Sequence, residues 1–591
     1  MGENLERLNA NLARVEELSQ RLVAALSQRE PGDAGLYGPG QEVYLKAGMA
    51  YWQDMMNNPA KLMEQQVQYW SETLTHYMDA QNAIASGSFK VSPAEDEATD
   101  RRFSNPLWQT HPYFNFVKQQ YLTSAKAVEE AVLGLEGLEG KDKHRVEFFA
   151  RQMIDMFSPT NFLATNPDAL ERAVETDGES LVKGMENLVR DIEAHKGEFL
   201  PTLADPNAFA LGENIGTAKG KVVYRNRMME LIQFAPTTET VHKTPLIIFP
   251  PWINKFYVMD LKPQNSLIRW IVDQGYTLFV VSWKNPDQSY ADTGLEDYIE
   301  DGYLKAFDVV REITDEKQVN AVGYCIAGTT LSLTLSLLKK RGETPVKSAT
   351  FFTTLVDFAD QGEFTVFLQN DFVDAIERQV EETGILDSYF MSKTFSYLRA
   401  NDLVYAPAVR SYMMGEAPPA FDLLFWNGDS TNLPGKMAIQ YLRGLCQSNA
   451  LAGEGFSLFD EVLHISDVTV PVCAIACETD HIAAWKDSYR GVQKMGSKSK
   501  TFILSQSGHI AGIVNPPSKK KYGHYTNDDI SLSNSDWREG ADFNEGSWWP
   551  RWETWLSKQS GKQVAARIPG EAGYPALCDA PGTYVSEQLE D

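Results

Sequence analysis

Several features that would assign this 591-residue chain to a broad class are missing from its sequence. Five cysteines are too few for so long a chain, and odd in number, to form a disulfide framework. The acidic excess gives a net charge of −26, which excludes the basic surface that general nucleic-acid binding requires. No apolar run is long enough to cross a bilayer, and the first residues lack the apolar core of a signal peptide. These absences predict a soluble cytoplasmic protein with reduced thiols, no nucleic-acid partner and no transmembrane segment.

Recognisable metal and cofactor motifs are missing too. Cys473 and Cys477 lie close together inside an apparent strand, but their spacing is not Cys-x-x-Cys. No paired histidine and cysteine set lies nearby to complete a group of four ligands. The sequence therefore predicts no metal site and no cofactor.

The pattern of apolar residues divides the chain into two parts. Residues 1–214 have a mainly helical pattern, and from residue 215 short apolar runs alternate with helical stretches. Such alternation is typical of a parallel sheet covered on both faces. Residues 360–465 interrupt it with aromatic, mostly helical sequence. We therefore predict a helical N-terminal domain, 1–214, and an α/β domain, 215–591, with a cap or lid inserted at about 360–465.

Two segments of the N-terminal part are candidates for contact with a partner or an apolar surface. Residues 5–26 place leucine and valine at three- and four-residue spacing, which predicts an amphipathic helix. The alternative is that this helix docks on its own domain. Aromatic residues gather between Phe103 and Tyr121, where the alternative is ordinary core packing.

The motif with the clearest chemistry is GYCIAG, residues 323–328. A strand-like run precedes it and an apolar helix follows, which is the architecture of a nucleophile elbow. Cys325 would be the nucleophile, with the small residues Gly323 and Ala327 two positions to either side. The backbone N–H of Ile326 would then point at the substrate oxygen, and the helix N-terminus would favour a thiolate. The alternative is a buried structural cysteine.

Two further residues follow Cys325 in the order that an α/β-hydrolase fold requires. Asp480 comes just after one predicted strand and His509 just after the next, and catalytic groups collect at the carboxyl ends of parallel strands. His481 is a poorer candidate for the base, because adjacent side chains seldom have the geometry of a catalytic pair. The backbone N–H of Ile253, after an earlier strand, is the candidate second oxyanion donor.

Several longer blocks resemble those of the polyhydroxyalkanoate synthases. They include SPTNFLATNPDAL, PPWINKFYVMDL, GYCIAGT, CETDHIAAW, SGHIAGIVNPP and GSWWPRWETWL, and the resemblance covers roughly residues 100–560. The length and the elbow sequence are similar to those of the class I enzymes, which act without a second type of subunit. Two positions depart from the family pattern: Ala327 stands where many members have glycine, and Trp252 where some have cysteine.

The resemblance implies a function. The expected substrate is (R)-3-hydroxyacyl-CoA, specifically 3-hydroxybutyryl-CoA, which is polymerised with release of CoA through an acyl group on Cys325. Asp480 and His509 carry over as its catalytic partners, and we expect Trp252 and His481 to shape the substrate pocket. The resemblance also implies a homodimer at the surface of polyester granules, in contact with the nascent granule and its coat proteins.

Sulfur suits this chemistry, since transfer from a CoA thioester to cysteine makes another thioester and keeps the chain activated. His509 would accept the thiol proton, whereas Asp480 would either orient His509 or deprotonate the attacking hydroxyl group. The predicted insertion would exclude water. Two alternatives remain: a cysteine hydrolase, such as a thioesterase or polyester depolymerase, and a non-catalytic granule protein with a relic elbow.

Overall fold

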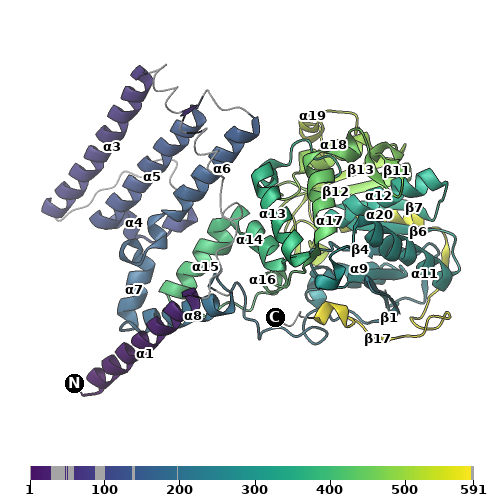
Figure 1. Ribbon diagram of the computed structural model, residues 1–591, viewed down its shortest axis with the longest axis horizontal. Helices are drawn as coiled ribbons and strands as arrows, with labels where there is room; N and C mark the ends of the chain where they lie inside the picture. The colour runs from purple at the N-terminus through teal and green to yellow at the C-terminus, as the bar shows by residue number, and fades with distance from the viewer. Residues whose placement is uncertain are drawn as a thin grey trace. The chain divides into compact units, whose positions relative to one another are not determined.

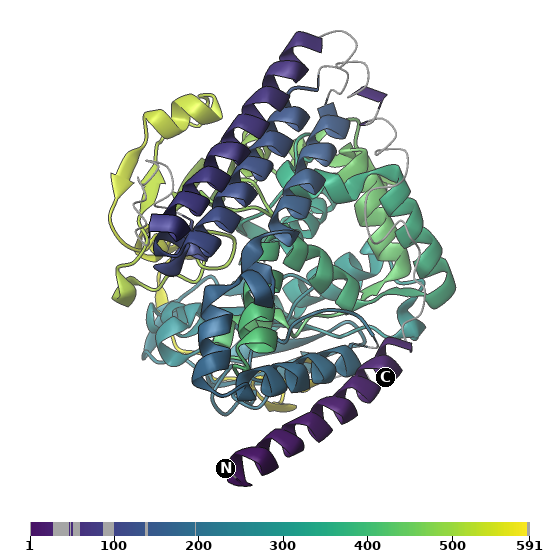
Figure 2. The ribbon, with the colours of Figure 1, turned by 90° about the vertical axis from the view of Figure 1, so that its left-hand side faces the viewer.

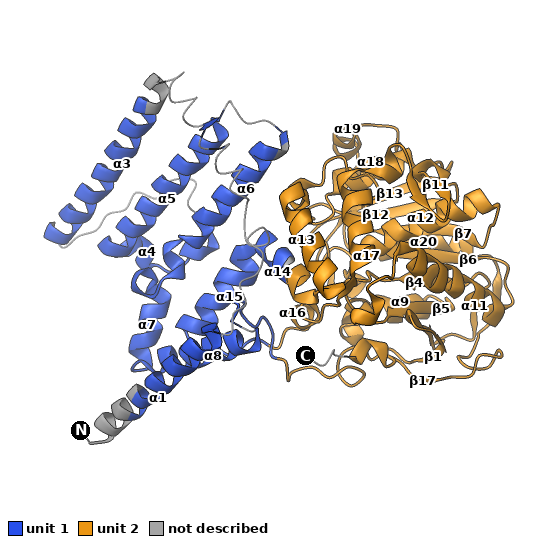
Figure 3. Cartoon of the chain, viewed as in Figure 1, with its two compact units in different colours: residues 1–205, 393–419 blue, residues 206–392, 420–591 orange. Residues whose placement is uncertain are grey.

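The computed structural model describes residues 2–27, 47, 49–50, 59–86, 100–135, 140–195 and 197–587. The chain forms two compact units (Figure 3): unit 1 comprises Met1–Asp205 with Lys393–Pro419, and unit 2 comprises Pro206–Ser392 with Ala420–Asp591. This division differs from the predicted boundary at residue 214 and divides the predicted insertion, 360–465, between the units. Within the described residues, no helix is both long enough and apolar enough to span a bilayer.

Unit 1 is helical, which confirms the predicted character of the N-terminal part (Figure 1). Its longer helices are α1 (Gly2–Ser27), α3 (Pro59–Ser86), α5 (Pro112–Leu133), α6 (Gly140–Met156), α7 (Pro167–Glu175) and α8 (Glu179–Ala194). Helix α1 docks on α8: the side chains of Leu18 and Ala25 are buried, and Arg21 donates two hydrogen bonds to Glu193 at 2.7 and 3.0 Å. For this helix, docking on its own domain is therefore the arrangement observed.

Residues 393–419 join unit 1 through contacts with α8. The Tyr412 hydroxyl group donates a hydrogen bond to Asp191 at 2.8 Å, and the Asn187 amide donates to the carbonyl oxygens of Ser411 and Glu416, each at 3.1 Å. A Cβ atom at Gly184 would lie 2.0 Å from the Tyr412 carbonyl oxygen, so this helix position requires glycine. These partners are more than 220 residues apart in sequence, so no local pattern could indicate the contact.

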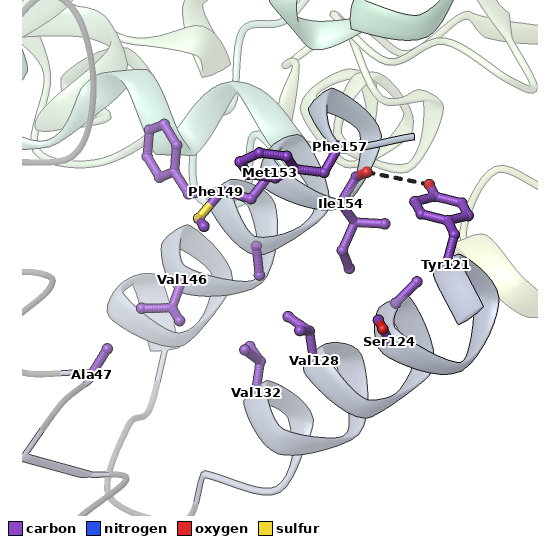
Figure 4. Close-up of a pocket in the computed structure, with 12 residues that line it drawn as sticks. Ala47, Tyr121, Ser124, Val128, Val132, Val146, Phe149, Met153, Ile154 and Phe157 are labelled. Carbon is purple, nitrogen blue, oxygen red and sulfur yellow. Dashed lines mark hydrogen bonds between the residues drawn. The ribbon is translucent and has the colours of Figure 1, made fainter. Parts of the chain in front are cut away.

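Most of the predicted aromatic segment packs inside unit 1. Phe103, Trp108 and Phe114 form a buried cluster, whereas Tyr113 is exposed. Core packing therefore accounts for three of these aromatic residues. A separate apolar pocket of about 370 Å³ lies between α5 and α6 (Figure 4), where the Tyr121 hydroxyl group donates to the Ile154 carbonyl oxygen at 3.2 Å.

Unit 2 is built on an eleven-stranded sheet with the order β15-β14-β13-β12-β7-β6-β4-β5-β2-β1-β17. Six adjacent central strands, from β13 to β5, are parallel, and the outer strands are antiparallel. The strands are β1 (Gly220–Arg225), β2 (Met229–Phe234), β4 (Leu246–Phe249), β5 (Leu278–Trp283), β6 (Val319–Tyr324), β7 (Val346–Phe352), β12 (Val472–Cys477), β13 (Lys500–Ser505), β14 (His524–Thr526), β15 (Asp542–Asn544) and β17 (Cys578–Asp579).

Helices cover the sheet of unit 2 on both faces, as the alternating pattern predicts (Figure 1). Helices α9 (Leu267–Asp273) and α20 (Trp549–Ser560) contribute to one core cluster with alternate residues of the central strands. Helix α12 (Ile326–Arg341), which follows β6, is buried along most of its length. Burial on both faces explains why β4, β5, β6 and β12 contain no exposed position.

The C-terminal segment is anchored to the sheet by the buried carboxylate of Glu230 on β2. This carboxylate accepts hydrogen bonds from the backbone N–H groups of Thr583 and Tyr584, at 2.9 and 3.1 Å, and from the Arg225 guanidinium at 2.8 Å. A glutamine at position 230 turns an N–H₂ group toward these donors. We expect Glu230→Gln to lower the free energy of unfolding by about 2 kcal/mol, measured by urea denaturation.

The same substitution is expected to release the segment locally. Hydrogen–deuterium exchange should speed up in peptides that cover residues 575–587. Asp579→Asn is the matched control, because Asp579 is exposed and pairs with Lys221 at the surface. Equal protection in Glu230→Gln and the parent chain would show that Glu230 is not the anchor.

Candidate active site

Cys325 occupies a sharp turn between β6 and α12. Its backbone has φ 55° and ψ −126°, a conformation that non-glycine residues seldom adopt. The turn is held at both ends, because the N–H of Cys325 donates to the Phe352 carbonyl oxygen on β7 at 2.7 Å and its own carbonyl oxygen accepts from Gly328 at 2.9 Å. The side chain is half-buried, at the carboxyl end of a central parallel strand. This is the strained geometry of a nucleophile elbow.

The close packing of this turn depends on glycine at positions 323 and 328. A Cβ atom at Gly323 would lie 2.5 Å from the Gly328 Cα atom, and one at Gly328 would lie 2.1 Å from the Thr354 hydroxyl oxygen. Ala327 fits with its methyl group fully buried, and its carbonyl oxygen accepts from the Tyr303 hydroxyl group at 2.7 Å. Alanine at position 327 is therefore compatible with the elbow, and the tight approach lies one residue later.

We expect Gly328→Ala to destabilise unit 2 by about 3 kcal/mol, because the added methyl group overlaps Thr354 in a packed interior. Ala327→Gly, the matched change at the neighbouring position, removes a methyl group early in a helix and should cost only about 1 kcal/mol. Urea denaturation of both variants measures the difference. The close-packing account is wrong if Ala327→Gly proves the more damaging.

Asp480 and His509 follow the neighbouring strands β12 and β13, and their side chains meet. The Nδ1 atom of His509 lies 2.7 Å from the Oδ2 atom of Asp480, and the Asp480 side chain is fully buried. The Oδ1 atom of Asp480 accepts from the backbone N–H groups of Ile482 and Ala483, each at 2.9 Å. Both carboxylate oxygens are therefore engaged, which fixes the carboxylate and, through it, the imidazole ring.

The charges around His509 favour its protonated form. Burial opposes the charged imidazolium, but the charges of Asp480 and of a Cys325 thiolate, with hydrogen bonds to both, raise the pKa of His509 well above its ordinary value. His509 is thus placed to take a proton from the cysteine, and the imidazolium that results is stabilised by Asp480. The structure brings together the three residues that the sequence singled out.

The other cysteines described in unit 2 have different surroundings. Burial raises the pKa of Cys446, Cys473 and Cys477, which keeps these thiols protonated and unreactive. Cys578 lies on the edge strand β17, five strands from β6 in the sheet order. Within the described residues, no group of three or more histidine, cysteine and acidic side chains is placed to hold a metal ion.

The two predicted oxyanion donors follow adjacent strands. Ile326 is the first residue of α12, and Ile253 lies in the loop after β4, the strand that pairs with β6. Both residues are buried, and the Ile253 carbonyl oxygen accepts from Thr431 at 3.2 Å. Their shared role in holding an oxyanion stays a prediction.

Trp252 and His481 have different positions around the site. The Trp252 side chain is only 1% exposed, its ring packs against Tyr298 and Tyr441, and its indole N–H donates to Thr330 on α12 at 3.2 Å. Trp252 is therefore part of the packed core next to the elbow. His481 adjoins Asp480 and is partly buried. A direct contact of either residue with substrate stays a prediction.

Two tyrosines near the site were missed in the sequence. The ring of Tyr441 packs edge-on against Trp252, with 5.7 Å between the ring centroids, and burial raises the pKa of its hydroxyl group. Tyr441 comes from residues 440–447 of the insertion, a segment that carries no recognisable motif in the sequence. Tyr324 donates a hydrogen bond to the His509 carbonyl oxygen at 3.3 Å, and only its place next to Cys325 could have drawn attention to it.

Comparison with protein families identifies both parts of the chain. A model described as the poly-beta-hydroxybutyrate polymerase (PhaC) N-terminus matches residues 99–271. A model of the alpha/beta hydrolase fold matches residues 244–516, which contain Cys325, Asp480 and His509. Together with the order of the central strands, the second match confirms the predicted α/β-hydrolase fold.

Three curated relatives match over most of their length. A poly(3-hydroxyalkanoate) polymerase of Methylorubrum extorquens is 40% identical over 98% of this chain and 96% of its own length. The polymerase subunit PhaC of Cupriavidus necator is 39% identical, covering 89% of this chain and 88% of its own. The corresponding subunit of Rhizobium etli is 38% identical, covering 99% and 92%. Identity at this level over nearly the whole chain shows that it belongs to the poly(3-hydroxyalkanoate) polymerase family.

Proposed function

We propose that this protein is an acyltransferase that polymerises (R)-3-hydroxyacyl-CoA, with 3-hydroxybutyryl-CoA as its principal substrate, and releases CoA. One observation carries the proposal: in a chain 40% identical to a named polymerase, the strained elbow presents a cysteine beside a buried histidine–aspartate pair. A cysteine at this position suits a thioester substrate, since the acyl group passes from one sulfur atom to another with little loss of activation.

The first half of the cycle loads the enzyme. His509 takes the proton of the Cys325 thiol, and the thiolate attacks the acyl-CoA carbonyl carbon. The backbone N–H groups of Ile326 and Ile253 stabilise the oxyanion of the tetrahedral intermediate. The carbon–sulfur bond to CoA then breaks, and His509 returns its proton to the departing CoA thiolate. An acyl thioester on Cys325 remains.

The second half of the cycle lengthens the chain. The 3-hydroxyl group of another unit attacks the acyl-cysteine carbonyl carbon, and His509 accepts the hydroxyl proton. An ester bond forms, the carbon–sulfur bond to Cys325 breaks, and the proton passes to the thiolate. Each cycle therefore exchanges one thioester bond for one ester bond and releases one CoA.

Asp480 acts in this scheme by orienting His509. Its side chain is fully buried, one oxygen contacts His509 and the other accepts two backbone hydrogen bonds. A carboxylate held this way has little freedom to reach a substrate hydroxyl group. These contacts support the orienting role over direct deprotonation of the substrate.

Water must be kept from the acyl-cysteine, and the part of the insertion in unit 2 is suited to this role. It supplies Tyr441, whose ring meets Trp252 and Phe358 edge-on beside the elbow. We assign residues 360–392 and 420–465 as the lid that limits entry to acyl-CoA and the growing chain.

The wider setting follows from the family. We propose a class I enzyme that acts as a homodimer in the cytoplasm, at the surface of polyester granules and in contact with their coat proteins. The match to the Methylorubrum extorquens polymerase, which covers 98% of this chain and 96% of that protein, supports the class. Unit 1 is the part that we assign to granule contact and to support of the dimer.

The proposed function is tested by following three products in one tube. The purified protein is incubated with (R)-3-hydroxybutyryl-CoA, and CoA, free 3-hydroxybutyrate and insoluble polyester are measured together. We expect CoA release to be matched by polyester. CoA matched by free acid would mean that the protein is a thioesterase, and no CoA release would favour the non-catalytic alternative.

A further inference from the structure

Exposed large apolar residues are concentrated in unit 1, and the largest group of them within one helix lies on α3. Unit 1 contributes nineteen of the twenty-four large apolar residues that the structure records as exposed, and seven of these belong to α3. Six of the seven fall on one line along the helix, which we call the outer seam. It consists of Met63, Val67, Trp70, Leu74, Tyr77 and Ile84, each between 51% and 70% exposed.

The outer seam has the spacing of a coiled coil. From Met63 to Ile84 its residues alternate at intervals of four and three, with the polar Gln81 filling the one interruption. Six steps over 21 residues give a period of 3.5, the heptad repeat that keeps a seam facing a partner helix. Three heptads of this repeat lie in one described helix.

The opposite side of α3 is the side that contacts its own unit. Helix α3 lies along α5 in two views (Figures 1 and 2). The Tyr69 hydroxyl group accepts a hydrogen bond from Gln120 at 3.1 Å, and His76 Nε2 lies 3.4 Å from the Thr123 hydroxyl oxygen. Ala83 is the buried residue of this contact. Helix α3 thus turns its smaller and more polar side inward and its larger apolar side outward, the reverse of a helix that has buried all of its apolar face.

We propose that the outer seam of α3 pairs with α3 of a second copy of this chain as an antiparallel coiled coil. Two-fold symmetry brings the same seam to both sides of the contact. When Trp70 of one copy lies opposite Leu74 of the other, Tyr77 lies opposite Val67 and Met63 lies opposite Gln81. Each layer then combines a large side chain with a smaller or more flexible one, so the seam is complementary to itself.

The charge pattern favours this partner over a lipid surface. Residues 63–85 contain three acidic residues and no lysine or arginine, whereas helices that lie on anionic membranes are rich in basic residues. The seam is also narrow, with polar residues such as Ser71 and Thr73 flanking it, and a flat apolar surface requires a wider face. The chain has a net charge of −26, so two copies repel each other. This repulsion is weakest where the surfaces that meet are uncharged, as the outer seam is.

Charge reversal on the seam tests the proposal in the full-length protein. The variant V67E/L74E places two carboxylates on the seam, and Q68E/T75E places them one residue further round the same helix as a matched control. All four positions are exposed, so folding should be preserved and is checked by circular dichroism. Sedimentation velocity over a concentration series should show self-association about tenfold weaker or more in V67E/L74E, and within about twofold of the parent chain in the control. Association of V67E/L74E equal to that of the parent chain, or a parent chain that stays monomeric, would overturn the proposal.

The orientation is tested by mixing differently tagged W70C and L74C variants under mild oxidation. The antiparallel arrangement predicts a mixed disulfide between positions 70 and 74 of different copies. Disulfides only between like positions would overturn the antiparallel arrangement. This test does not depend on the catalytic activity proposed above.

Discussion

Replacing Cys325 with alanine is expected to reduce CoA release from 3-hydroxybutyryl-CoA on the order of 10⁴-fold and to abolish polyester formation. The elbow holds this sulfur atom in a strained backbone conformation beside His509, whereas burial keeps the thiols of Cys446, Cys473 and Cys477 protonated. Without the sulfur atom the enzyme has nothing to carry the acyl chain. Initial rates of CoA release and the mass of insoluble polymer measure the loss.

Two further variants show whether the loss reflects sulfur chemistry. Cys578→Ala removes a partly buried thiol on the edge strand and should retain the parent rate. Cys325→Ser keeps a hydroxyl nucleophile in the elbow but forms an ordinary ester, so we expect acyl loading without further chain growth. Multiple rounds of polymerisation by Cys325→Ser would contradict the thioester account.

Replacing Asp480 with asparagine is expected to reduce CoA release about 10³-fold, and replacing His509 with glutamine about 10⁴-fold. Asparagine retains the shape of the carboxylate but not its negative charge, which stabilises the imidazolium of His509. Glutamine at position 509 cannot accept the cysteine proton. The rate of Cys325 alkylation by iodoacetamide, mapped by mass spectrometry, should fall in both variants.

The same pair gives the protein a pH-dependent stability. Since Asp480 raises the pKa of His509 in the folded state, the pair stabilises the fold below the ordinary histidine pKa, and this contribution is lost as the pH rises through the raised value. The unfolding free energy of Asp480→Asn should therefore fall further below that of the parent chain at about pH 6 than at about pH 10. A difference that does not vary with pH would show that the pair is not ionised as proposed.

The parts of this protein that could be predicted from sequence follow from local pattern and one rule of topology. The elbow is a local motif, and the carboxyl ends of parallel strands meet at one edge of a sheet, so Cys325, Asp480 and His509 could be placed together without a structure. The α/β-hydrolase fold followed from the same strands. At the elbow itself, the sequence departs from the family pattern at Ala327, whereas the contact that requires glycine is between Gly323 and Gly328.

The missed features depend on contacts between residues distant in sequence. Residues 393–419 join unit 1 because Tyr412 and Ser411 meet α8 across more than 220 positions, and Glu230 holds a segment more than 350 residues away. Tyr441 packs against Trp252 beside the elbow from an insertion with no motif of its own. The outer seam of α3 has a clear heptad pattern, but only the structure shows that it faces away from its own unit.

The central claim is that Cys325 carries a growing chain and passes it to a hydroxyl group. Its most direct test is mass spectrometry of the peptide that contains Cys325, after a short reaction with 3-hydroxybutyryl-CoA and an acid quench. We predict a ladder of adducts on Cys325 that differ by whole 3-hydroxybutyrate units. A single unit on Cys325 that decays to free acid would contradict chain growth at this site, and adducts on another residue would contradict the role of Cys325.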